Sequence, residues 1–96
     1  MAVALEMEFR GGTLDQYDQV MDRMGLRPGG EAPPEGLLFH WVKRTDEGIQ
    51  VTDVWETKDA FDAFAQAKIA PITQEVGVPG PPEIRFYDVH NYLAGS

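Results

Sequence analysis

Residues 36–57, GLLFHWVKRTDEGIQVTDVWET, contain two apolar stretches separated by the turn-forming residues TDEG. This pattern predicts a β-hairpin with strands from about 37 to 44 and from about 49 to 56. By strict alternation, one face of the first strand presents Leu37, Phe39 and Trp41, and the other presents Leu38 and Val42. Because both faces are apolar, both need cover. The hairpin is therefore expected to lie between two layers.

The length of the TDEG loop sets the register of this hairpin. With Arg44 and Ile49 flanking the loop, His40 lies opposite Asp53. Leu38 is then opposite Trp55 and Val42 opposite Val51. Directly opposed residues have Cβ atoms about 4.5–5.5 Å apart, within reach of an imidazole–carboxylate hydrogen bond. The sequence thus predicts that the two ionisable groups of the hairpin are partners.

The first strand and the first helix follow from alternation and from capping residues. Residues 2–9 alternate in polarity with period two, which predicts a strand with one buried face. Thr13 is expected to be a helix N-cap, with Gln16 completing a capping box, and Gly25 to be the C-cap. Residues 27–36 hold three prolines and three glycines, which predicts a loop.

After the hairpin, Thr57 is expected to cap a second helix. The apolar stripe of that helix is formed by Ala60, Phe61, Phe64, Ala65 and Ile69. Pro71 is expected to interrupt it, with a short third helix following, and residues 83–93 are predicted to form the last strand.

The resulting order, βαββαβ, predicts a single α+β domain over residues 1–96. This is the ferredoxin-like arrangement, a four-stranded antiparallel sheet with two main helices on one face. Two helices cover one side of such a sheet, so the apolar second face of the hairpin needs another layer. A second copy of the chain is the simplest candidate, and we expect a homodimer.

Charge and composition exclude several classes of function. Sixteen acidic and eight basic residues give a net charge of −8, which disfavours nucleic acid as a partner. The absence of cysteine excludes disulfides and thiolate sites. No apolar run is long enough to span a membrane, and the N-terminal residues lack the basic region of a signal peptide. A cytoplasmic protein without a membrane partner is the expectation.

The chain resembles the dimeric α/β barrel superfamily, and within it the small bacterial proteins grouped with the antibiotic biosynthesis monooxygenases. The resemblance rests on the element order, on VTDVWETKDAFDAF (51–64) and on FYDVHNYL (86–93). It implies two sheets packed face to face, a ligand cavity between sheet and helices, and activities such as cofactor-independent oxygenation, haem degradation, isomerisation or cyclisation. Haem-degrading members carry a histidine in the second helical region, whereas residues 57–76 contain none. We therefore expect no haem.

The candidate catalytic residues are His40, Asp53 and His90. A carboxylate on one imidazole nitrogen fixes the tautomer and raises the basicity of the other, which suits a general base for a phenolic or enolic substrate. The alternative is a purely structural polar pair. His90 is either a second histidine of the pocket or a strand-end residue bonded to the backbone. The two histidines lack the close spacing of a metal site, so no metal is expected.

Aromatic residues are the candidates for substrate binding: Trp55, Trp41, Phe64 and Tyr17. Nucleotide-binding loops and a serine nucleophile motif are absent, so no cofactor is expected. The sequence favours a cofactor-independent monooxygenase, cyclase or isomerase acting on a small aromatic or polyketide-like molecule. The alternative is a non-catalytic homodimeric protein that binds a small molecule or serves as an accessory.

Overall fold

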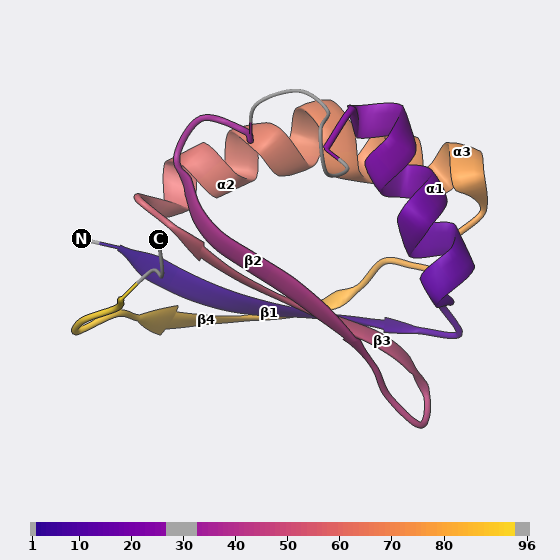
Figure 1. Ribbon diagram of the computed structural model, residues 1–96, viewed down its shortest axis with the longest axis horizontal. Coiled ribbons are helices and arrows are strands. Elements are labelled where there is room, and N and C mark those ends of the chain that lie inside the picture. Colours follow the sequence, from indigo (N-terminus) through magenta and orange to yellow (C-terminus); the bar gives the residue numbers. More distant parts are fainter. Residues whose placement is uncertain (1, 27–32, 94–96) are drawn as a thin grey trace.

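The computed structural model describes residues 2–26 and 33–93. Its four antiparallel strands are β1 (Val3–Arg10), β2 (Leu37–Arg44), β3 (Gly48–Trp55) and β4 (Glu83–Asp88). They form one sheet in the order β2-β3-β1-β4, with the helices on one side (Figure 1). The predicted ferredoxin-like α+β fold is confirmed. Part of the loop predicted at 27–36 lies outside the described residues.

Helix α1 (Leu14–Met24) begins and ends as its sequence predicts. The Thr13 hydroxyl accepts the backbone N–H of Gln16, and the Gln16 side chain accepts the backbone N–H of Thr13, each at 3.1 Å. Gly25 ends the helix in the left-handed conformation, with φ 74°. This reciprocal capping satisfies two N–H groups that the helix itself leaves without partners. The predicted caps of α1 are confirmed.

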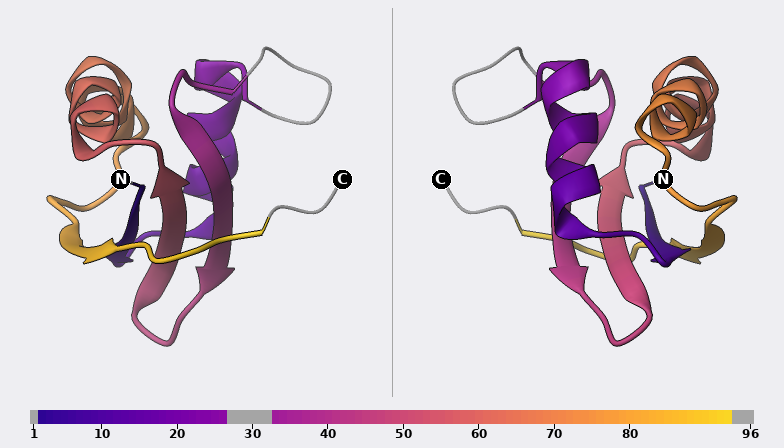
Figure 2. Two further views of the ribbon diagram at one scale, coloured as in Figure 1. Left: turned by 90° about the vertical axis from the view of Figure 1, so that its left-hand side faces the viewer. Right: turned by 90° about the vertical axis from the view of Figure 1, so that its right-hand side faces the viewer.

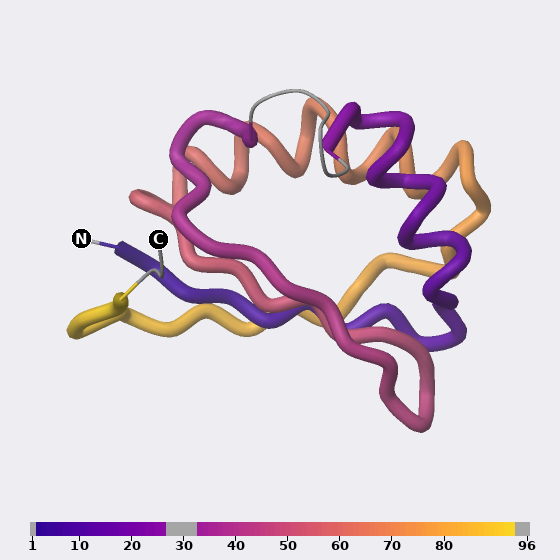
Figure 3. The backbone as a smooth tube through the Cα atoms, in the orientation of Figure 1, coloured from indigo at the N-terminus to yellow at the C-terminus, as the bar shows by residue number. Residues whose placement is uncertain are grey.

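The second helical region does not break at Pro71, so the expected interruption is wrong, whereas the short third helix expected after it is present. Helix α2 (Lys58–Phe64), capped by Thr57, continues through a π-helical stretch, η1 (Ala65–Ile69), into α3 (Ala70–Val76). Figure 3 shows one continuous path from α2 to α3. A proline inside a regular helix clashes with the carbonyl four residues earlier. In η1 the Ala70 N–H instead bonds the Ala65 carbonyl, so the helix is wider just before the proline.

No helix within the described ranges is both long and apolar enough to cross a membrane.

The hairpin has the predicted register over most of its length. Arg44 pairs with Ile49, Val42 with Val51 and His40 with Asp53. A bulge lies between Leu37 and Phe39, so Trp55 is opposite Leu37 rather than Leu38. Because the extra residue of a bulge reverses the alternation, Leu37 packs against the core instead of sharing a face with Phe39 and Trp41. The predicted Leu38–Trp55 pair is therefore wrong.

Strand β4 is shorter than predicted. It ends at Asp88, which is opposite Val3 at the start of β1. Past this point the Val89 N–H bonds the Ala2 carbonyl at 3.1 Å, and the chain leaves the sheet. A strand continues only while a neighbouring strand supplies ladder partners. His90 and Tyr92 thus lie beyond the strand that was expected to hold them.

The two faces of the sheet differ in cover. The helices and one face enclose a buried core of Leu5, Met7, Phe9, Ile49, Val51, Trp55 and Phe61. Figure 2 shows α1 and the α2–α3 region side by side on that face. The other face carries large, partly exposed aromatic residues: Phe39 at 48% exposure, Trp41 at 45% and Tyr87 at 47%. Within the described ranges no helix covers this second face.

Gly36, just before β2, is expected to tolerate no side chain. Its φ is +90°, and an added Cβ would lie 2.8 Å from the Ala60 Cβ. Gly77 has nearly the same backbone conformation, φ +91°, with open space around it. Positive φ costs a non-glycine residue roughly 1 kcal/mol. We expect Gly77→Ala to lose about that much unfolding free energy, and Gly36→Ala to lose about 1–3 kcal/mol more through overpacking, as measured by urea denaturation. Equal losses of unfolding free energy in the two variants would show that Ala60 moves aside at no cost.

Candidate functional site

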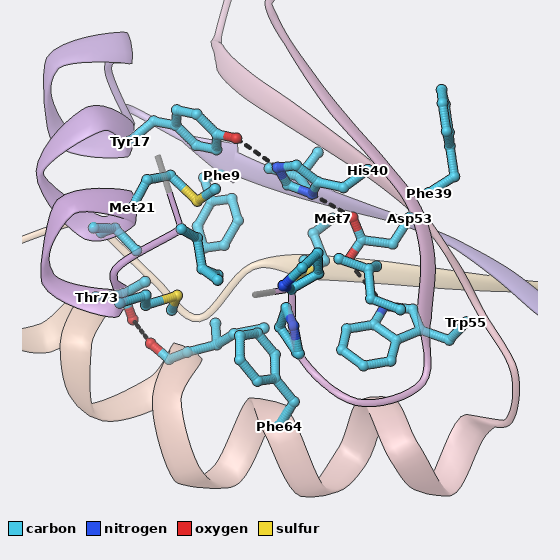
Figure 4. Close-up of a pocket in the computed structure, with 18 of the residues that line it drawn as sticks. Met7, Phe9, Tyr17, Met21, Phe39, His40, Asp53, Trp55, Phe64 and Thr73 are labelled. Atoms are coloured by element: carbon cyan, nitrogen blue, oxygen red, sulfur yellow. Dashed lines mark hydrogen bonds and ion pairs between the residues drawn. The ribbon is translucent and has the colours of Figure 1, made fainter. Parts of the chain in front are cut away.

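A cavity of about 360 Å³ lies between the sheet and the helices. Its walls come from α1, from the helix-facing sides of β1, β2 and β3, and from the α2–α3 region (Figure 4). Most of the lining is aliphatic, aromatic or methionine, and it includes Met7, Phe9, Val20, Met21, Met24, Ile49, Val51, Trp55, Phe64 and Ile69. A pocket of this size and apolar character is typical of small-molecule sites.

The predicted pairing of His40 with Asp53 is confirmed, and both residues lie on the cavity wall. The imidazole Nδ1 is 2.6 Å from Asp53 Oδ1. The Asp53 residue is 4% exposed, and the His40 side chain is 24% exposed. The bond joins β2 and β3 at the point where the register places the two residues opposite each other.

The second oxygen of Asp53 is bonded by Trp55. The indole N–H donates to Asp53 Oδ2 at 3.0 Å, and Trp55 is fully buried. A buried carboxylate is costly unless donors surround it. Here two side chains, one on each oxygen, supply them. Sequence reasoning placed Trp55 in the pocket but missed its bond to Asp53, because residues two apart on a strand share a face and the pairing rule considers only opposite strands.

Tyr17 of α1 completes the row of polar groups. Its hydroxyl lies 2.5 Å from His40 Nε2 (Figure 4). Burial, and to a lesser degree the negative charges of Asp53 and Asp18, raise the pKa of Tyr17 to about 12. The phenol is therefore neutral at neutral pH. A neutral phenol that donates to Nε2 matches a neutral imidazole that donates from Nδ1 to Asp53, and this assignment satisfies both bonds.

The chain Tyr17–His40–Asp53–Trp55 was foreseen only in its central pair. The sequence placed Tyr17 on the apolar stripe of its helix and treated it as a substrate-binding residue. The structure shows that its hydroxyl occupies the nitrogen that a general base would use. The one signal in the sequence was a polar hydroxyl on an otherwise apolar stripe. Its partner depends on how α1 docks, which periodicity does not specify.

The remaining candidate residues are divided between the cavity and the surface. Phe64 lines the cavity, with its ring centroid 5.5 Å from that of Trp55. Trp41 points to the opposite, open face of the sheet, where the Lys43 Nζ is 6.0 Å from its ring centroid. His90 is exposed, follows the end of β4 and is not part of the cavity lining. The structure therefore brings together His40, Asp53, Trp55, Tyr17 and Phe64, but not Trp41 or His90.

Across residues 2–26 and 33–93, no group of three histidine, cysteine or acidic side chains is arranged to hold a metal ion.

The fold and its cavity define a ferredoxin-like α+β protein with an apolar cavity between its sheet and its helices. No protein-family model matches the chain, and neither does any curated protein. Solved structures do match. Rv0793 from Mycobacterium tuberculosis is similar with a TM-score of 0.66 and 13% identity, over 98% of this chain and 100% of the other.

Two further similar structures come from Streptomyces. SnoaB from Streptomyces nogalater, a cofactor-independent oxygenase, has a TM-score of 0.61 and 18% identity, over 98% of this chain and 97% of its own. A monooxygenase from the gene ActVA-Orf6 of Streptomyces coelicolor, in complex with nanaomycin D, has a TM-score of 0.53 and 19% identity. The match covers 99% of this chain and 92% of the other. At these identities the likeness establishes the fold, and the predicted resemblance is confirmed at that level.

The raised pKa of Tyr17 gives a direct test of the row of polar groups. Between the usual tyrosine pKa of 10.0 and about 12, Tyr17 stays protonated in the folded chain but ionises in the unfolded chain. Stability should therefore fall as pH rises through this window. We expect the tyrosinate absorbance titration to show a component with a midpoint near 12 that disappears in Tyr17→Phe. Far-UV circular dichroism at each pH checks that the chain stays folded, and persistence of the component in the variant would contradict the assignment.

Proposed function

We propose that this protein is a cofactor-independent enzyme acting on a small aromatic or polyketide-like substrate, with His40 as general base and Asp53 as the group that orients it. One observation carries the proposal: an imidazole–carboxylate pair on the wall of an otherwise apolar cavity. With its proton on Nδ1 held by Asp53, His40 has its basic lone pair on Nε2. Removal of a proton from a phenol or enol there creates the imidazolium that the buried carboxylate stabilises.

The substrate's own conjugation supplies the remaining chemistry. A phenolate or enolate delocalised over fused rings reacts with oxygen, closes a ring or isomerises without help from a bound cofactor. The flat rings of Trp55 and Phe64 give such a substrate an aromatic wall. Similar folds include proteins described as a cofactor-independent oxygenase and a monooxygenase, which supports chemistry of this kind.

A second candidate function is non-catalytic binding of a small molecule. It is favoured by the completeness of the polar row, because both nitrogens of His40 and both oxygens of Asp53 already have side-chain partners. A fully satisfied network is what a purely structural role would require.

Substitution of the pair distinguishes the two functions. Oxygen consumption and product formation would be followed with a panel of anthrones and naphthols. We expect His40→Ala and Asp53→Asn to lower turnover about 10²–10⁴-fold, because each removes the positioned base or its tautomer control. Asp46→Asn makes the same chemical change on the exposed hairpin loop and should leave turnover unchanged. Full activity of His40→Ala would end the catalytic proposal, and ligand binding without turnover in the wild type would favour the second candidate.

We also propose that the protein is a homodimer, assembled through the open face of its sheet. The support is the set of large aromatic side chains, Phe39, Trp41 and Tyr87, each nearly half exposed on that face. Exposed apolar surface of this kind marks interaction sites. A stable interface should bury more than about 1,500 Å² in total.

The dimer is tested by adding a charge to its predicted interface. Trp41→Glu places a carboxylate among the exposed aromatics, and burying it against a second copy would be costly. We expect light scattering to show a dimer for the wild type and a monomer for Trp41→Glu at micromolar concentration. Glu47→Gln, on the exposed hairpin loop, is the control and should remain dimeric. A folded, monomeric wild type would contradict the proposal.

A further inference from the structure

The polar end of the cavity has no unused hydrogen-bonding atom on its central groups. His40 bonds Tyr17 through Nε2 and Asp53 through Nδ1, and Asp53 bonds Trp55 through its other oxygen. Elsewhere in the lining, the Thr73 hydroxyl already donates to a carbonyl of its own helix. Among the described residues, no buried side-chain nitrogen or oxygen lacks a partner. A ligand that hydrogen-bonds to His40 must therefore replace an existing bond.

The bonds in this row differ in how costly they are to break. The Asp53–Trp55 bond joins residues with 4% and 0% exposure, so breaking it would leave a buried carboxylate short of a donor. The His40–Asp53 bond shares that carboxylate and sets the tautomer. Tyr17, by contrast, is only half buried and belongs to α1 rather than to the sheet. Its hydroxyl can be released at the lowest cost.

We propose that Tyr17 occupies the place of a substrate hydroxyl, and that a neutral phenol or enol displaces it from His40 Nε2 when it binds. This inference rests on the proposed function and deepens it by naming the class of ligand and the bond it exchanges. The exchange replaces one phenol–imidazole hydrogen bond with another. Tyr17 is thus a positioning residue that keeps His40 Nε2 hydrogen-bonded while the cavity holds no substrate.

The charge of the lining defines the ligand further. None of the described residues that line the cavity is a lysine or an arginine. The one charged group among them is the carboxylate of Asp53, in a chain with a net charge of −8. A carboxylate or phosphate on the ligand would be desolvated with no cation to pair with. The site therefore selects a neutral hydroxyl compound over its anionic analogue.

Three naphthalene probes test the exchange by calorimetry at pH 7.5: 2-naphthol, 2-methoxynaphthalene and 2-naphthoate. In the wild type, 2-naphthol should be only slightly preferred over the methyl ether, since one hydrogen bond replaces another. In Tyr17→Phe the nitrogen has no side-chain partner, so this preference should grow about 3- to 10-fold, the worth of one net hydrogen bond. In both proteins 2-naphthoate should bind at least about 10-fold more weakly than 2-naphthol, because its charge is buried unpaired.

Tyr92→Phe is the matched control. It removes the hydroxyl of an exposed tyrosine that follows β4 and is not part of the cavity lining, and it should bind the probes as the wild type does. A second measurement uses the wild type alone. The ¹³Cζ resonance of Tyr17, assigned in the wild type through its connection to the sequentially assigned backbone, should shift when 2-naphthol is added and stay in place with 2-methoxynaphthalene. This reading decides the matter if the variant does not fold.

The outcomes separate this inference from the proposed enzyme. A preference for 2-naphthol that stays constant or falls in Tyr17→Phe would show that Tyr17 is not displaced. An affinity for 2-naphthoate equal to that for 2-naphthol would overturn the inferred selection against anionic ligands. The assay needs no turnover, so an inactive wild type that shows the exchange would contradict the proposed enzyme and leave this inference standing. Failure of all three probes to bind would overturn both.

Discussion

The buried carboxylate of Asp53 is the interaction on which the candidate site depends. It is 4% exposed and lies among the apolar side chains of the core, so it is tolerated only with donors on both oxygens. Trp55 and His40 are those donors, and the need for both of them restricts the structure. The indole must face the carboxylate from the same strand, and β2 must be in the register that puts His40 opposite. One electrostatic requirement is thus met by the register of the hairpin, and the residues that meet it form two walls of the cavity.

The consequences extend from the sheet to the helices. Because Asp53 holds Nδ1, the other nitrogen of His40 points toward α1 and meets the Tyr17 hydroxyl. The row of polar groups therefore joins β3, β2 and α1 across a region that is otherwise apolar. The position of Tyr17 along this row depends on where α1 starts, and the Thr13–Gln16 capping box sets that start. A local capping motif and a long-range buried pair together determine the geometry of the site.

The parts of this arrangement that could be predicted are those that short-range rules determine. Loop length fixed the hairpin register and hence the His40–Asp53 pair, and capping residues fixed the ends of α1. The parts that could not be predicted depend on tertiary contacts. The bulge after Leu37, the π-helical accommodation of Pro71 and the end of β4 each arise where a neighbouring element constrains the chain. The contact between Tyr17 and His40 belongs to this group, since two correct local predictions do not give the distance between a helix and a sheet.

The bulge also explains why the first hairpin strand is apolar on both sides. Strict alternation assigns three large residues to the open face, but Leu37 and Leu38 both line the cavity once the bulge is present. Beyond it, alternation resumes, so His40 faces the cavity and Trp41 faces outward. The residues proposed for chemistry and those proposed for assembly thus lie on opposite sides of one strand. They lie on one strand but have different partners: Asp53 and Tyr17 bond His40, whereas Lys43 lies over the ring of Trp41.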